Sequence, residues 1–152
     1  MLLFCSVPLP AEAADTDAAL RIAASEGRLQ QVRGLLAEGA NVNAQDSAGR
    51  TALINAAAAG NPRTSRLLLS AGANADSVDQ RGRSALMEAS AFGHEAVVRL
   101  LIGMGVDVNA KDQAGFSALK LSELGGHSAV VELLRASGAV DEAEEKVEEE
   151  PQ

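Results

Sequence analysis

The amino-acid sequence predicts an all-α solenoid of four helix-turn-helix units joined by β-turn loops. The first observation is a period of 33 residues, which aligns DSAGRTALINAAAAG, beginning at Asp46, with DQRGRSALMEASAFG, beginning at Asp79. A third copy begins at Asp112, and a weaker copy precedes the others. A fixed period of this length is typical of stacked supersecondary units. The second observation is composition: aromatic residues make up 2% of the chain, and the β-branched and aromatic runs that favour strands are absent.

Residues 1–13 are expected to form a secretory signal or another apolar leader. MLLFCSVPLP is an apolar run, and the small residues of AEA at 11–13 are typical of a cleavage site. No Lys or Arg precedes the run, which leaves an uncleaved leader as the alternative. A membrane span is not expected, because the run is short and contains Pro8 and Pro10. We therefore expect export to the periplasm or the extracellular space, with a cytoplasmic location as the alternative.

Each following unit is expected to contain two short helices. In the copy at 79–111, Ser84 can cap the first helix and Gly93 ends it. The second helix begins near His94, and Gly105 suits the positive φ that commonly ends a helix. Side chains expected to face the stack recur at i, i+3, i+4 spacing, namely Leu86, Ala89 and Ser90, then Val98, Leu101 and Ile102. Helices this short are unstable alone, so neighbouring units must bury these faces.

The four units are expected at 14–45, 46–78, 79–111 and 112–140, with the first and last acting as caps. In the second unit, Pro62 should start the second helix. Ser65 stands where the other copies have valine, and an unpaired buried hydroxyl costs about 1–3 kcal/mol. This unit is therefore expected to be the least stable internal repeat. In the last unit, polar residues replace apolar ones and are expected to form an outer face: Ser122, Glu123 and Arg135.

The units resemble ankyrin repeats over nearly all of 15–140. The matching words are G-x-[ST]-A-L at Gly49, Gly82 and Gly115, GH at 93–94 and 126–127, and LLAEGANVNA at 35–44. The family's T-P-L-H word is replaced by TALI, SALM and SALK. The resemblance implies an L-shaped stack in which paired helices carry loops that project sideways. It also implies a concave groove where a protein partner docks.

The sequence contains no residue pattern that indicates an enzyme, a cofactor or a metal site. Residues 14–140 hold 13 acidic and 12 basic residues, so no basic face for nucleic acid is expected. His94 and His127 are equivalent by the repeat, and we expect each to bond a loop carbonyl at a helix start. Asp46, Asp79 and Asp112 recur at one loop position, which favours capping of the loop backbone over acid–base catalysis.

The partner-binding residues are predicted around two phenylalanines. By resemblance to the family, Phe92 at the end of its helix faces the groove, and Phe116 on a loop tip borders it. An exposed aromatic side chain of this kind often anchors an interface. The expected apolar centre consists of Ala58, Ala59, Ala91 and Leu124, and the expected cationic rim of Arg50, Gln80, Arg81, Arg83, Lys111 and Gln113. The alternative is that these side chains only cover the helix ends.

Residues 141–152, DEAEEKVEEEPQ, are expected to form an acidic disordered tail. A second hypothesis has this tail folding back onto Arg50, Arg81 and Arg83. The sequence as a whole predicts a non-enzymatic module that binds a protein partner as an adaptor, inhibitor or stabiliser, and that is monomeric when free. The alternative function is an accessory factor that helps an exported enzyme mature without forming a stable complex.

Overall fold

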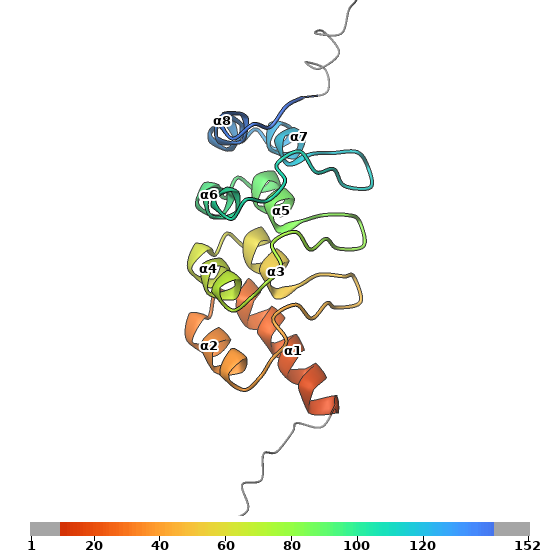
Figure 1. Ribbon diagram of the computed structural model, residues 1–152, viewed down its shortest axis with the longest axis vertical. Helices are drawn as coiled ribbons and strands as arrows, with labels where there is room; N and C mark the ends of the chain where they lie inside the picture. The colour runs from red at the N-terminus through yellow and green to blue at the C-terminus, as the bar shows by residue number, and fades with distance from the viewer. Residues whose placement is uncertain (1–9, 142–152) are drawn as a thin grey trace, which may run out of the picture.

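A computed structural model describes the backbone of residues 10–141 and the side chains of residues 13–141. This part of the chain contains eight α-helices, arranged as a stack of hairpins (Figure 1). Their bounds are α1 Pro10–Ser25, α2 Leu29–Ala37, α3 Ala52–Ala58, α4 Pro62–Ser70, α5 Ala85–Ala91, α6 Glu95–Gly103, α7 Ala118–Leu124 and α8 Ser128–Ala136. The predicted all-α repeat solenoid is confirmed. Within 10–141, extended pairing is limited to isolated bridges, Val78 with Ser84 and Lys111 with Ser117.

The hairpins stack so that their first helices form one row and their second helices another. The inner row is α1, α3, α5 and α7, and the outer row is α2, α4, α6 and α8, each helix packing on its neighbours in the row and on its hairpin partner. The core repeats with the sequence: Leu20, Leu53, Leu86 and Leu119 are all buried. Between the inner helices lie fully buried alanines, Ala23, Ala56 and Ala89, whose small side chains allow close approach.

The predicted start and stop signals of the helices are present. Thr51, Ser84 and Ser117 each accept a hydrogen bond from the backbone N–H three residues later, at 3.2–3.3 Å. Gly93 and Gly105 have φ of 75° and 78°, the left-handed conformation that ends a helix without a Cβ clash. Pro62 begins α4, as predicted. These local signals fix the length of each hairpin arm.

Ser65 on α4 confirms the expectation of an unpaired hydroxyl in the stack. Its side chain is fully buried, and its Oγ has no hydrogen-bond partner among the described residues. Val32 and Val98, at the equivalent repeat position, are also fully buried. The site was therefore built for an apolar side chain, and Ser65 leaves a polar atom without compensation.

Two features at the ends of the stack differ from the sequence-based expectation. Helix α1 begins at Pro10, so the last residues of the expected leader are helical, while 1–9 lie outside the described residues. Ser122, expected on a polar outer face, is fully buried, and its hydroxyl is satisfied by donating to the Leu119 carbonyl at 2.7 Å within α7. Glu123 and Arg135 do form a surface pair, with a 3.0 Å separation. Within 10–141, no helix combines the length and apolarity that crossing a membrane would require.

Candidate functional site

One aspartate organises each loop between hairpins. In the third repeat, Asp79 Oδ1 accepts hydrogen bonds from the backbone N–H groups of Arg81 and Arg83 at 2.9 and 3.0 Å. Asp46 and Asp112 make the same pair of bonds in their own loops. The prediction that these carboxylates cap loop backbone is therefore confirmed. The loops present a rigid, repeated edge next to the inner helices.

Neighbouring loops are also bonded to each other. The backbone N–H of Gln80 donates to the Ala48 carbonyl at 2.9 Å, and that of Gln113 donates to the Arg81 carbonyl at 3.0 Å. Close approach of these backbones requires the glycine that follows each accepting residue, Gly49 after Ala48 and Gly82 after Arg81. A Cβ at Gly49, where φ is +77°, would lie 3.0 Å from the Gln80 nitrogen. Gln80 and Gln113 are exposed on this edge, as the sequence predicts.

A column of polar side chains joins successive hairpins at the other end of the inner helices. His94 Nε2 lies 3.0 Å from the Ala58 carbonyl, and His127 Nε2 lies 3.0 Å from the Ala91 carbonyl. Asn61, at the same repeat position, donates to the carbonyls of Ala24 and Ser25 at 3.2 and 3.1 Å. The predicted histidine–carbonyl bonds are present. However, the accepting carbonyls belong to the last turn of the preceding inner helix and not to a loop. Carbonyls in the last turn of a helix have no hydrogen-bond partner within that helix.

A shallow groove of about 520 Å³ crosses α1, α3 and α5. Its lining residues come from the inner helices and from two loops: Ser25, Arg50, Asn55, Ala58, Ala59, Arg81, Glu88 and Phe92. Five of them belong to the set predicted from sequence. The predicted residues Arg83, Ala91, Leu124, Gln80, Gln113, Lys111 and Phe116 do not line this depression.

Phe92 stands at the C-terminal end of α5, where the helix gives way to Gly93. Its side chain is 57% exposed, and its ring lies tilted against the imidazole of His94, with 6.2 Å between the centroids. Ala58 and Ala59, the neighbouring residues of α3 and its end, are too small to cover it. The groove thus carries one large exposed apolar side chain, and its other apolar lining residues are the two alanines.

Glu88 forms the charged centre of the groove. Its carboxylate is nearly buried, at 6% side-chain exposure, and receives Arg50 Nη2 at 3.2 Å and Arg83 Nη1 at 3.3 Å. Arg50 also lies 3.6 Å from Asp79, and Arg83 lies 3.0 Å from Asp112. The two guanidiniums therefore alternate with three carboxylates across neighbouring repeats.

This network corrects the predicted cationic rim. Arg50 and Arg83 were expected to be exposed cations, but their side chains are 21% exposed and ion-paired, so they present little free positive charge. Arg81 fits the prediction better: its side chain is 69% exposed, and its contact with Asp79 is long, at 3.9 Å. The carboxylate that pairs with both Arg50 and Arg83 is Glu88 of the inner helix α5.

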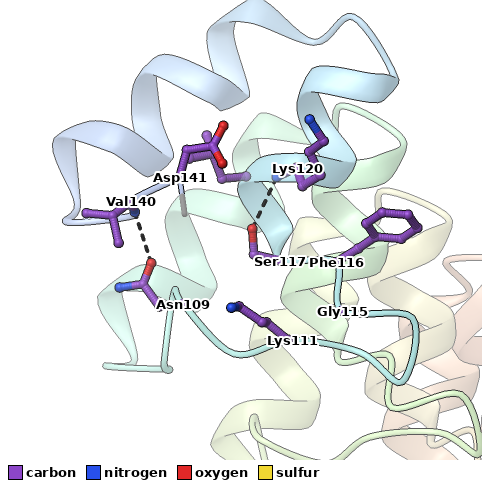
Figure 2. Close-up of a pocket in the computed structure, with 9 residues that line it drawn as sticks. Asn109, Lys111, Gly115, Phe116, Ser117, Lys120, Val140 and Asp141 are labelled. Atoms are coloured by element: carbon purple, nitrogen blue, oxygen red, sulfur yellow. Dashed lines mark hydrogen bonds between the residues drawn. The ribbon is translucent and has the colours of Figure 1, made fainter. Parts of the chain in front are cut away.

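Phe116 lies in a different place from Phe92, although both were expected to border one groove. It is 37% exposed and lines a pocket of about 310 Å³ at the C-terminal end of the stack (Figure 2). The same pocket is lined by Lys111, Lys120 and Val140. Val140 is held there by a hydrogen bond from its N–H to Asn109 Oδ1 at 3.0 Å. The two aromatic residues therefore define two separate surfaces.

Sequence reasoning missed Glu88, Asn55 and Ser25 as groove residues. The repeat itself carries a usable signal, because Asn55 and Glu88 are 33 residues apart and Arg50 and Arg83 precede them at equal spacing. Asn55 does accept from Arg50 Nε at 2.9 Å within its own repeat. The cross-repeat bond from Arg50 to Glu88 needs the stacking geometry, which a single copy does not reveal.

Comparison with known proteins agrees with this architecture. A family model described as ankyrin repeats, in three copies, matches residues 20–112. The match covers more than half of the chain, and the protein therefore belongs to the ankyrin-repeat family. A search of curated proteins found no significant match. Ankyrin repeats are general protein–protein interaction modules. Within 10–141, no group of three or more His, Cys, Asp or Glu side chains could hold a metal ion.

Proposed function

We propose that this protein binds a protein partner through the groove across α1, α3 and α5, acting as an adaptor, inhibitor or stabiliser. The observation that carries the proposal is Phe92, an exposed aromatic side chain that lines the same groove as Ala58 and Ala59. Aromatic anchors in such settings concentrate binding energy when a partner covers them. The groove offers a partner one large apolar contact beside two alanines and an ion-paired charged centre.

The charges around Phe92 support the same reading and indicate the chemistry of the partner. Arg50, Glu88 and Arg83 already satisfy one another, so a partner that covers them does not leave an unpaired charge behind. Arg81 remains an exposed cation at the edge of the groove. We therefore expect a partner surface with an apolar residue opposite Phe92 and a carboxylate opposite Arg81.

Photo-crosslinking in the native organism tests this proposal and identifies the partner. A photoreactive amino acid at Ala59, which is exposed in the groove, should capture a discrete protein. The control position is Met104, which is 54% exposed but absent from the groove lining. A crosslink from Ala59 and not from Met104 supports groove binding. Equal crosslinking from both, or from Met104 alone, contradicts it. Maturation of an exported enzyme without a stable complex would leave Ala59 without a discrete product.

We also propose that the chain is exported, on the support of the apolar run and the AEA word at 11–13. Cleavage after Ala13 would keep the buried residues of α1, Leu20, Ala23 and Ala24, in the mature protein. N-terminal sequencing of the protein from its native source should begin at Ala14. A chain recovered from the cytoplasm with residues 1–13 intact would contradict the proposal.

A further inference from the structure

The outer helices carry arginines at one repeat position, and their surroundings differ. Arg33, Arg66 and Arg99 lie 33 residues apart on α2, α4 and α6. On α6, Glu95 sits one turn before Arg99 and binds it at 2.7 Å. The residues at the position of Glu95 on α2 and α4 are Leu29 and Pro62, which have no side-chain acceptor. The sequence thus removes the acid that would neutralise the first two arginines.

Arg33 and Arg66, together with Arg63, line a depression on the surface of the outer row. It measures about 700 Å³ and is lined by apolar residues of three helices together with the arginines: Leu29, Arg33, Pro62, Arg63, Arg66, Leu67, Ser70 and Ala96. All three arginine side chains are exposed, and within 10–141 none forms an ion pair or a side-chain hydrogen bond. Helices α2, α4 and α6 lie in the outer row, away from the α1/α3/α5 groove (Figure 1).

This combination selects an anionic, partly apolar peptide. A guanidinium presents paired N–H donors that match a carboxylate, and it gives up its hydration more easily than an ammonium group. The floor formed by Leu29, Pro62, Leu67 and Ala96 can accept one aliphatic side chain. A ligand that fits both features has several carboxylates flanking a single aliphatic residue.

We propose that the depression of the outer row binds the acidic segment 142–152 of the same chain. This segment reads EAEEKVEEEPQ: it has six glutamates, one lysine and one valine, Val147, which lies between Lys146 and Glu148. Its composition is the one that the depression selects. The alternative target, the loop-tip arginines, is weaker because Arg50 and Arg83 are already held by Glu88. Charge complementarity therefore directs the segment to the outer helices.

The length of the segment allows the contact within one molecule. The structure describes the chain up to Asp141, beyond α8 at the C-terminal end of the stack. Residues 147–150 lie six to nine positions beyond Asp141, which allows them a span of about 20–32 Å. Neighbouring helices in a row pack at about 8–10 Å, which places α4 about 16–20 Å from α8. The acidic residues around Val147 can thus reach Arg63 and Arg66 without a second copy of the chain.

Paramagnetic broadening in the full-length protein tests this contact. A nitroxide is attached at Gln152→Cys in a Cys5→Ser background, and amide signals are recorded at low salt. The amides of Arg66, Leu67 and Ala96 should broaden more than those of the groove residues Ala58 and Phe92. Adding salt should weaken the effect, because exposed charges are screened. Broadening centred on Arg81, or absent from α4, would overturn the proposal.

Two controls separate this contact from general attraction and from association between molecules. Arg66→Gln should reduce the broadening at Leu67 about twofold or more, whereas Arg81→Gln, which removes an equal charge from a loop tip, should leave it unchanged. Equal effects of the two substitutions would count against a specific site. In a mixture of spin-labelled protein without isotope label and isotope-labelled protein without spin label, the amide signals should not broaden. Broadening in that mixture would assign the segment to a second copy and contradict the intramolecular contact.

Discussion

At the scale of single residues, the stack buries one hydroxyl that destabilises it and one carboxylate that links neighbouring repeats. Ser65 buries a hydroxyl without a partner, and Glu88 buries a carboxylate with two. The unpaired hydroxyl could be predicted from the sequence, because the other repeats show valine at the same position. The role of Glu88 could not, because its partner Arg50 lies 38 residues away and meets it only after two repeats have stacked.

Ser65→Val should raise the free energy of unfolding by about 1–2 kcal/mol, because it removes an unsatisfied hydroxyl and restores the side chain of the equivalent sites. Urea denaturation followed by circular dichroism measures the change. Ser70→Val on the exposed side of α4 is the control and should shift stability by less than about 0.5 kcal/mol. A loss of stability in Ser65→Val would show that the site is too small for valine.

Glu88→Ala should lower the free energy of unfolding by about 2 kcal/mol or more, since it leaves two half-buried guanidiniums without their shared carboxylate. The same denaturation experiment applies. Glu132→Ala, an exposed acid on α8, provides the comparison and should be close to neutral. If both variants unfold at the same urea concentration, the network contributes nothing to stability.

At the scale of elements, helix caps and loop turns were predictable because they depend on residues close in sequence. Thr51, Ser84 and Ser117 cap their helices, and the loop aspartates bond to the backbone beside them. The start of α1 was not predictable. The AEA word favours a cleavage site, but Pro10 is also a suitable first residue of a helix, and residues 10–13 are helical. The same three residues suit a cleavage site and the first turn of a helix, so the start of α1 could not be predicted from them.

The side chains of Asn61, His94 and His127 should each stabilise the packing of one hairpin on the preceding one. His94→Ala removes the bond to the Ala58 carbonyl and should cost about 1 kcal/mol of stability. His94→Asn should keep part of this stability, because Asn61 makes the equivalent bonds in its own repeat. Thermal unfolding of the three proteins measures the order. The explanation is wrong if His94→Asn is less stable than His94→Ala.

At the scale of the whole molecule, the repeat determines the architecture. The binding surface depends on the positions at which individual repeats differ from one another. The helix rows follow from a periodic core, so the ankyrin stack could be predicted with its element order. The binding surface could be predicted only in part: Phe92, Ala58, Ala59 and Arg81 line the groove, while Phe116 lines the separate C-terminal pocket. Phe92 ends an inner helix whereas Phe116 lies on the loop before α7, so the repeat does not bring the two side chains to one surface.

The central claim is that Phe92 anchors a protein partner in the groove, and one affinity measurement tests it most directly. The partner captured from Ala59 is titrated against the wild type, Phe92→Ala and Phe116→Ala by isothermal calorimetry. Phe92→Ala should weaken binding about thirtyfold, the equivalent of about 2 kcal/mol, and Phe116→Ala should change it by less than about threefold. Unchanged thermal unfolding of both variants excludes misfolding. Full affinity in Phe92→Ala, or a larger loss in Phe116→Ala, would contradict the account.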